Sequence, residues 1–253
     1  MKINKINISR ACHLLKSQTP LAVYLKLIKF VLFKKRMSGY IDKKIAFENS
    51  LANKKFSVDW FIGNIPIWHD VFCEAGIEQN KKYNILEIGS FEGLSSLFLL
   101  QTFPYSMVTC VDTWAGADEH STLDMRKIED NFDFNTSPYK DRLIKYKGTS
   151  FSFFEKRDVY SETYDIIYVD GSHYVDDVMV DGLRCFSMLK NGGLIIFDDY
   201  MWDGYRQMSA NPAAAINALI KMKSNFLKVK AAYRQLILLK IASESHDASQ
   251  VSL

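Results

Sequence analysis

The chain has 253 residues, of which 48% are hydrophobic and 24% are charged, a composition typical of globular proteins that excludes disorder along the whole length. Its four cysteines form no CxxC pair and no apolar run reaches about 18 residues, so a disulfide framework, a structural zinc site and a membrane-spanning helix are not expected. The net charge of +3 hides an asymmetry, because residues 1–60 carry 13 Lys and Arg against 3 Asp and Glu.

Residues 1–55 are predicted to form a basic, partly helical N-terminal extension. Leu25, Ile28, Val31 and Leu32 recur at helical spacing with lysines between them, which indicates an amphipathic helix. Three roles stay open for this helix: packing on the main domain with its lysines in water, docking on an anionic lipid surface, or contacting a partner. No secretory signal is recognisable, so we expect a cytoplasmic location, with contact at the inner face of the membrane left open. Nucleic-acid binding is not expected, because no nucleic-acid motif accompanies the basic residues.

From residue 83 onward, strand-like apolar runs alternate with helical patterns. This alternation predicts one α/β domain over residues 56–242, with a mostly parallel sheet covered by helices on both faces. Residues 58–72 carry four aromatic side chains and are expected beside the mouth of the site, and residues 243–253 form a polar tail. The expected strands are 84–89, 107–112, 143–147, 164–170 and 194–197, with a closing hairpin of 227–231 and 235–241, and the expected helices are 94–103, 121–132, 175–189 and 213–223.

The turn after the first expected strand has the pattern E-x-G-x-x-x-G, from Glu87 to Gly93. Gly89 and Gly93 allow a tight turn and a close approach of the backbone to a ligand at the start of the next helix. The pattern lacks the G-x-G-x-x-G of dinucleotide sites, so a nucleoside without a diphosphate fits better. Asp112 ends the second strand about 20 residues later, where a carboxylate can accept hydrogen bonds from both ribose hydroxyls.

Three carboxylates and a histidine follow the fourth and fifth expected strands. Asp170 and His173 end one strand, and Asp198 and Asp199 end the other. Neighbouring carboxylates repel unless a cation neutralises them, so Asp170, Asp198 and Asp199 are candidate ligands for Mg²⁺ or a similar ion. His173 is a candidate general base, because an imidazole can accept a proton near neutral pH.

Four motifs together resemble class I S-adenosylmethionine-dependent methyltransferases, and among them the bacterial macrocin-type sugar O-methyltransferases. The resemblance covers about residues 58–241 and implies a Rossmann-like sheet of seven strands whose last strand is antiparallel. It implies S-adenosylmethionine as cofactor and, in metal-dependent relatives, Mg²⁺. The motifs are Glu87-Ile-Gly-Ser-Phe-Glu-Gly93, Val111-Asp-Thr-Trp114, Val169-Asp-Gly-Ser-His-Tyr174 and Gly192-Gly-Leu-Ile-Ile-Phe-Asp-Asp-Tyr200.

The resemblance also implies roles for individual residues. Asp112 is expected to hold the ribose, and Trp114 to cover the adenine. Asp170, Asp198 and Asp199 occupy the metal-binding positions, and Asp170 is also expected at the catalytic centre. The residues expected around the cofactor are Glu87, Gly89, Ser90, Gly93, Asp112, Thr113, Trp114, Thr149, Ser150 and Asp170.

The sequence departs from the macrocin-type pattern at one position. Those enzymes carry Asp-Gly-Asp, whose second Asp is thought to act as the base, and Ser172 stands there in this chain. Catechol-type relatives place a lysine three residues past the first metal Asp, where this chain has His173, so His173 is the expected base.

The expected function is methyl transfer to a hydroxyl of a sugar or small metabolite, with divalent-metal assistance left open. A nicotinamide-dependent oxidoreductase and a non-catalytic nucleoside-binding or membrane-docking module of the same fold stay as alternatives. A phenol and a lipid-linked glycan are further conceivable acceptors. Homo-oligomerisation is also left open.

Overall fold

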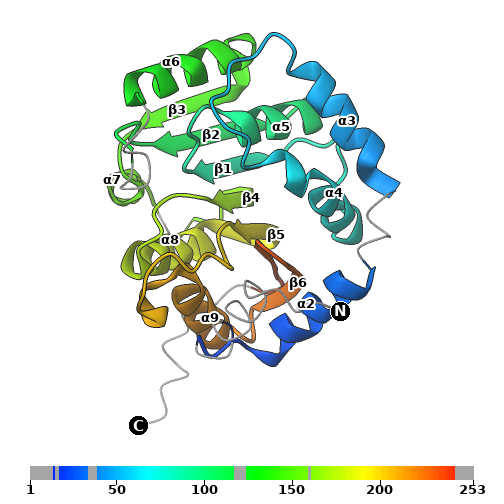
Figure 1. The fold of residues 1–253 in the computed structure, drawn as a ribbon, viewed down its shortest axis with the longest axis vertical. Coiled ribbons are helices and arrows are strands. Elements are labelled where there is room, and N and C mark those ends of the chain that lie inside the picture. Colours follow the sequence, from blue (N-terminus) through cyan, green and yellow to red (C-terminus); the bar gives the residue numbers. More distant parts are fainter. Residues whose placement is uncertain (1–13, 15–16, 34–38, 117–123, 159–160, 243–253) are drawn as a thin grey trace.

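A seven-stranded sheet runs through the centre of the computed structural model, which describes residues 14, 17–33, 39–116, 124–158 and 161–242 (Figure 1). The strand order is β3-β2-β1-β4-β5-β7-β6. Neighbours among β1 to β5 pair in parallel, whereas β7 is antiparallel to both β5 and β6. The predicted fold is therefore confirmed, including the antiparallel last strand. The strands are β1 Asn84–Ile88, β2 Met107–Asp112, β3 Leu143–Lys147, β4 Tyr164–Val169, β5 Leu189–Phe197, β6 Leu227–Ala232 and β7 Leu236–Lys240.

Helices cover both faces of the sheet (Figure 1). The helices are α2 Leu21–Phe33, α3 Ile41–Ser50, α4 Ile65–Glu74, α5 Leu94–Thr102, α6 Met125–Thr136, α7 Ser150–Glu155, α8 Val175–Met188 and α9 Pro212–Met222. Short 3₁₀ turns are η2 Ile62–Asn64, η4 Ser137–Arg142 and η5 Met208–Ala210.

Several elements differ from the sequence prediction: the fifth strand is longer, helix α6 runs to Thr136 rather than to residue 132, and helices α4 and α7 are additional. The fifth strand begins at Leu189 rather than at residue 194, because residues 190–193 form a bulge within the strand, where the pairing with β4 shifts register. Helix α7 was not predicted, since six residues are too few to show helical periodicity, but Thr149 caps it by accepting a hydrogen bond from the Ser152 N–H. The first residues of the expected helix 121–132 and the tail 243–253 lie outside the described residues.

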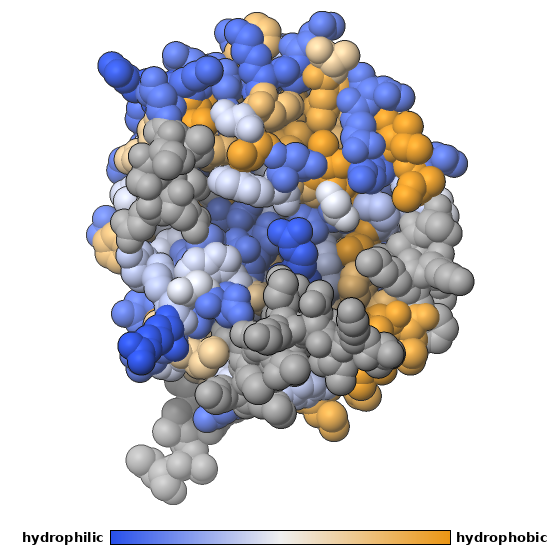
Figure 2. Space-filling model, in the orientation of Figure 1, coloured by the Kyte–Doolittle hydropathy of each residue, from blue (hydrophilic) through white to orange (hydrophobic). Residues whose placement is uncertain are grey.

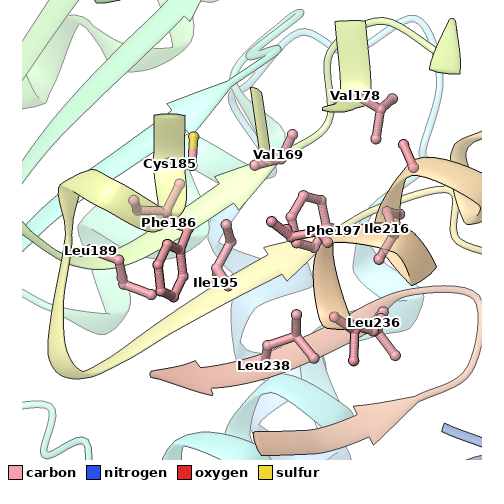
Figure 3. Close-up of a cluster of buried hydrophobic side chains, with 14 of the residues drawn as sticks. Val169, Val178, Cys185, Phe186, Leu189, Ile195, Phe197, Ile216, Leu236 and Leu238 are labelled. Atoms are coloured by element: carbon pink, nitrogen blue, oxygen red, sulfur yellow. The ribbon is translucent and has the colours of Figure 1, made fainter. Parts of the chain in front are cut away.

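Alternate residues along the strands face two separate hydrophobic cores. Ile166 and Leu194 pack in the core with α4, α5 and α6, whereas Ile167 and Ile195 pack in the core with α8 and α9 (Figure 3). Because side chains alternate with a period of two, Tyr168 and Asp198 face the side that carries α4 and α5. Polar groups at the end of this face can therefore meet groups from α4.

The N-terminal segment is joined to the main domain by buried contacts. Helix α2 packs along β6, the edge strand of the sheet, and Val23 has no exposed surface. The Asn217 side chain donates a hydrogen bond of 3.0 Å to the Ser17 carbonyl. The packing role predicted for this helix therefore holds for one of its faces, and the domain boundary at residue 55 stays a prediction.

Within the described part of the chain, no helix combines the length and the apolar character needed to cross a bilayer.

Candidate active site

The loops that follow β1, β2, β4 and β5 lie at one edge of the sheet. Backbone pairing continues past the strand ends: Gly89 donates to the Val111 carbonyl, Asp170 to that of Ile88 and Asp198 to that of Val169, at 2.8 to 2.9 Å. These loops therefore start side by side, at the carboxyl edge where open α/β sheets bind ligands.

The glycine turn after β1 is shaped by close contact with β4. Gly89 has φ +84°, and a β-carbon built on it would lie 1.8 Å from the Asp170 carbonyl oxygen. Gly93, with φ +82°, begins helix α5, and Phe91 between them also has positive φ at +46°. Such left-handed backbone at a non-glycine residue is strained and is found disproportionately at functional sites.

Asp112 ends β2 and holds this turn in place. One carboxylate oxygen accepts hydrogen bonds from the Ser90 and Phe91 N–H groups at 2.9 and 2.8 Å, and the other accepts one from the Trp114 N–H at 2.7 Å. The second oxygen therefore keeps acceptor capacity for a ligand hydroxyl. Asp112 is half-buried, at the edge where the resemblance expects the ribose.

Glu87 lies inside the protein rather than at the open edge. Its side chain has no exposed surface and accepts hydrogen bonds from the hydroxyls of Ser90, Ser95 and Ser96. Burial raises the pKa of Glu87, and the serine hydroxyls oppose that rise. In this structure Glu87 supports the turn through Ser90, and a direct cofactor contact by Glu87 stays a prediction.

The residues expected around the adenine differ in exposure. The Trp114 ring is buried, packs on Phe132 at 4.8 Å and donates its indole N–H to the Phe91 carbonyl. Thr113, Thr149 and Ser150 lie at least partly in solvent after β2 and β3. The structure thus places Trp114 behind the turn rather than on an open surface.

Asp170 and Asp198 converge on one phenol. The Tyr168 hydroxyl oxygen lies 2.8 Å from Asp170 Oδ2 and 2.5 Å from Asp198 Oδ2. The hydroxyl has one proton to donate, so the second carboxyl needs a proton or a cation of its own. Burial and the two neighbouring carboxylates raise the pKa of Asp170 well above its usual range, and burial followed by Asp199 raises that of Asp198 to about 6.

A buried polar chain lies behind Tyr168. Gln235, fully buried, donates to the Tyr168 hydroxyl at 3.4 Å and accepts from the Trp68 indole N–H at 2.6 Å and from the Tyr233 hydroxyl. The sequence reasoning did not find Tyr168 or Gln235. The available signal was the period of two along β4, which puts Tyr168 on the same face as Asp170.

Asp199 pairs with His173 instead of joining the other two carboxylates. His173 Nε2 lies 2.7 Å from Asp199 Oδ2, and Asp199 has φ +51°. When the ring is neutral, this contact favours the tautomer with its proton on Nε2 and leaves Nδ1 as the basic nitrogen. The two strand ends therefore build an Asp–His pair, the arrangement of an oriented general base.

The expected metal site is not assembled in this arrangement. Among the residues that the structure describes, no group of three His, Cys, Asp or Glu side chains is placed to hold a metal ion. Asp170 and Asp198 offer hard oxygen ligands, but Asp199 is held by His173. Two of the three carboxylates thus share the Tyr168 hydroxyl and the third pairs with His173, so the three-carboxylate metal site stays a prediction.

An aromatic wall stands next to the Asp–His pair. The Trp202 ring lies 4.6 Å from the His173 ring, and Tyr205 lies 4.8 Å from Trp202 and 5.2 Å from Tyr174, stacked on the latter. A small cleft beside them is lined by Asp170, His173, Asp198 and Asp199, among others. The cleft thus combines carboxylates with an imidazole, and the ring of Trp202 packs against that imidazole.

Comparison with known proteins shows what the central part of the chain resembles. Residues 86–200 match the family model described as a methyltransferase domain. A relative, an uncharacterized protein of Acanthamoeba polyphaga mimivirus, is 27% identical over 135 residues, which are 53% of this chain and 58% of that protein.

Solved structures share the fold at low sequence identity. A putative caffeoyl-CoA O-methyltransferase from Staphylococcus aureus has a TM-score of 0.54 and 14% identity over 83% of this chain and 98% of that one. TomG, an O-methyltransferase from Streptomyces achromogenes solved in complex with SAM, has a TM-score of 0.51 and 13% identity over 79% of this chain and 89% of its own. MycE, a methyltransferase from the mycinamycin biosynthetic pathway solved with Mg, SAH and mycinamycin VI, has a TM-score of 0.52 and 16% identity over 77% of this chain.

This chain spans only 53% of the length of MycE and 58% of that of the mimivirus protein. The glycine turn, Asp112, the Asp–His pair and the carboxylates up to Asp199 all fall inside the matched residues 86–200. Residues 86–200 therefore match the methyltransferase-domain model, and the chain shares the Rossmann-like fold of these solved methyltransferases.

Proposed function

We propose that this domain transfers a methyl group from S-adenosylmethionine to a hydroxyl of a sugar or small metabolite. The observation that carries the proposal is the Asp199–His173 pair, which stands at the same sheet edge as the glycine turn held by Asp112. One side of the edge can thus bind a nucleoside, and the other can take a proton from a hydroxyl. The SAM and SAH found with TomG and MycE support the choice of cofactor.

The cofactor side is formed by backbone and one carboxylate. Gly89 and Gly93 bring the main chain close to the ligand position, with Ser90 between them, and Asp112 offers its remaining acceptor to a ribose hydroxyl. Thr113, Thr149 and Ser150 border the adenine side. When bound, the sulfonium supplies an electrophilic methyl group.

The acceptor side is formed by His173 and the aromatic wall. Trp202 and Tyr205 present flat apolar faces on which the C–H face of a sugar or a small ring can pack. His173 Nδ1 would take the proton from the acceptor hydroxyl, and Asp199 would stabilise the imidazolium that forms. A bound S-adenosylmethionine would supply the methyl group and leave as SAH. Asp170, beside the cleft, helps to position the acceptor. Alignment of the two reactants supplies much of the rate.

Metal assistance is a separate part of the proposal. The hydroxyl can be deprotonated by His173 and Asp199 alone, so this proton transfer requires no cation. The ligand set Asp170, Asp198 and Asp199 stays a proposal, and its direct test is whether Mg²⁺ raises the melting temperature and a chelator reverses the effect.

Calorimetry and a methylation assay test the cofactor and the base. S-adenosylmethionine or SAH should bind and NAD should not, and NAD binding without SAM binding would favour the oxidoreductase alternative. In an assay with sugar and phenol acceptors, His173→Ala should lower kcat about a hundredfold or more while leaving SAM affinity unchanged. Asp199→Asn should lower kcat as well, because Asn cannot stabilise the imidazolium.

The outcomes separate the two routes to a reactive hydroxyl. Full activity in chelator, with a large His173 effect, supports the metal-independent base. A small His173 effect together with complete loss of turnover in chelator would assign the activation to a cation and overturn His173 as the base.

A further inference from the structure

Helix α2 presents a second apolar face that no described residue covers. Leu21, Leu25, Ile28 and Leu32 recur at i, i+4, i+7 and i+11 and are 73%, 59%, 55% and 70% exposed. Figure 2 shows hydrophobic surface at the lower right of the molecule, where α2 runs in Figure 1. Four large exposed side chains in one row are unusual on a monomeric protein and mark an interaction site. We call them the leucine stripe.

The leucine stripe is not the face that holds the helix to the protein. Val23 is fully buried on another side of the helix, Leu27 is half-buried there, and Phe30 stacks on Tyr233 at 5.3 Å. The helix is thus already folded and anchored along β6 by these contacts. Changes to the leucine stripe should leave the fold intact.

Basic side chains lie next to the stripe. Lys26 and Lys29 project from the same helix, and Lys228 and Lys230 of β6 lie near enough to lower the pKa of Lys26, after burial and Lys29. Glu74 is the acidic group in this cluster, bonded to Lys29 at 3.3 Å and 3.9 Å from Lys230. Asp70 also lines the groove beside α2. The cluster keeps an excess of positive charge.

The sequence adds charge on both sides of the helix. Lys34, Lys35 and Arg36 follow α2 directly, and residues 1–60 carry 13 Lys and Arg against 3 Asp and Glu. An apolar stripe with adjacent lysines is the pattern of a helix that lies in the interface of an anionic bilayer.

A second copy of the chain fits the leucine stripe less well than an anionic membrane does. A two-fold pairing through the leucine stripe would bring each lysine cluster towards its own copy, and like charges at an interface are repulsive. Anionic lipid headgroups would neutralise the same charges. We propose that α2 docks the protein on an anionic membrane surface, with the leucine stripe in the acyl boundary and Lys26, Lys29 and Lys228 at the headgroups.

Vesicle sedimentation with the full chain tests this inference, independently of methyl transfer. The protein should bind vesicles of phosphatidylcholine containing about a quarter phosphatidylglycerol, bind far less to phosphatidylcholine alone, and dissociate as salt rises. The double variant Leu25→Ser/Ile28→Ser should bind about tenfold more weakly or worse, because two inserted side chains are lost.

Two further variants sharpen the test. Lys29→Gln/Lys228→Gln should weaken binding to anionic vesicles without affecting the fold. Tyr105→Ser removes another exposed large side chain, 63% exposed and far from α2 in the sequence, and should bind like the unaltered chain. Circular dichroism checks that each variant is folded.

Equal binding to neutral and anionic vesicles, or no binding to either, would overturn the proposal. So would dimerisation in sedimentation equilibrium that is lost in Leu25→Ser/Ile28→Ser, since it would assign the leucine stripe to a second copy.

Discussion

Gly89 is the residue whose lack of a side chain the site depends on. Its β-carbon position lies 1.8 Å from the Asp170 carbonyl oxygen, so a side chain here would push β4 away from β1. In the same turn, the N–H groups of Ser90 and Phe91 donate to Asp112, and that of Gly89 donates to the Val111 carbonyl. A substitution at Gly89 would therefore disturb the cofactor side and the carboxylate side together.

We predict that Gly89→Ala destabilises the fold by about 3 kcal/mol, the sum of a left-handed backbone and a steric clash. Gly76→Ala is a matched control, because Gly76 has φ +71° but nothing within 4 Å of its β-carbon position. It should lose only about 1 kcal/mol. Urea unfolding of the two variants measures the difference, and equal losses would contradict the steric contact seen here.

The Tyr168 hydroxyl is predicted to contribute more to the stability of the fold at alkaline than at acid pH. The pKa of Asp198 is raised to about 6, so Asp198 is ionised at about pH 8 and neutral at about pH 5. A hydrogen bond to a charged group contributes about 1.5–3 kcal/mol, against about 0.5–1.5 for a neutral one. Tyr168→Phe should therefore destabilise more at about pH 8.

The control for Tyr168→Phe is Tyr164→Phe. Tyr164 is also buried, but its hydrogen-bond partner is the neutral Thr109 hydroxyl. Tyr164→Phe should lower the stability of the fold by similar amounts at both pH values. A Tyr168→Phe effect that does not change with pH would mean that the phenol does not donate to an ionised Asp198.

Helix α4 carries Trp68, which contacts the polar chain behind the site, and His69, a histidine with a shifted pKa. Trp68 of this helix reaches Gln235 behind Tyr168, and the next residue, His69, is 7% exposed and packs on Phe98. Burial, and then Lys43, lowers the pKa of His69 from 6.5 to about 4. The ring is therefore neutral in the folded protein at neutral pH.

His69 is predicted to make the fold sensitive to acid. The contribution of the neutral ring to the free energy of unfolding is fully present above about pH 6.5. It is lost as pH falls towards about 4, because the unfolded chain then binds a proton that the folded chain does not. His69→Phe keeps a ring and removes this titration. Between about pH 7 and about pH 5, the urea midpoint should fall less in His69→Phe than in the unaltered chain. A larger fall in the variant would show that His69 is already charged when folded.

The order of strands and helices could be predicted from the sequence, but much of the site could not. Apolar alternation and the glycine turn predict the sheet and its carboxyl edge, which the structure confirms. The partners of Glu87, Asp199 and Tyr168 depend on side chains from other elements, such as Ser96, His173 and Gln235. Those pairings arise only when the elements pack together, so the local sequence pattern does not predict them.

At the scale of the whole molecule, the N-terminal segment contributes to both cores. Val23 of α2 is buried in the core with α8 and α9, and Phe47 of α3 packs edge-on against Phe98 at 5.5 Å in the other. Helix α2 also covers β6, the edge strand. A covered edge cannot template pairing with another chain.

We predict that a chain starting at Lys54 melts at a lower temperature than the full chain and aggregates on heating. Each large side chain removed from a core costs about 1.5–3 kcal/mol, and the β6 edge becomes accessible. A chain lacking residues 243–253 is the control and should melt like the full chain. An unchanged melting temperature for the chain that starts at Lys54 would support residues 1–55 as a separable extension.

The pairing of α2 with β6 also affects the protein while it is being made. About 200 residues separate the end of α2 from the end of β6, so the ribosome needs on the order of 10–40 s to deliver the strand after the helix has emerged. During that interval both apolar faces of α2 lack the contacts of the finished fold. The nascent helix is then available to a chaperone or a membrane before the domain that it belongs to exists.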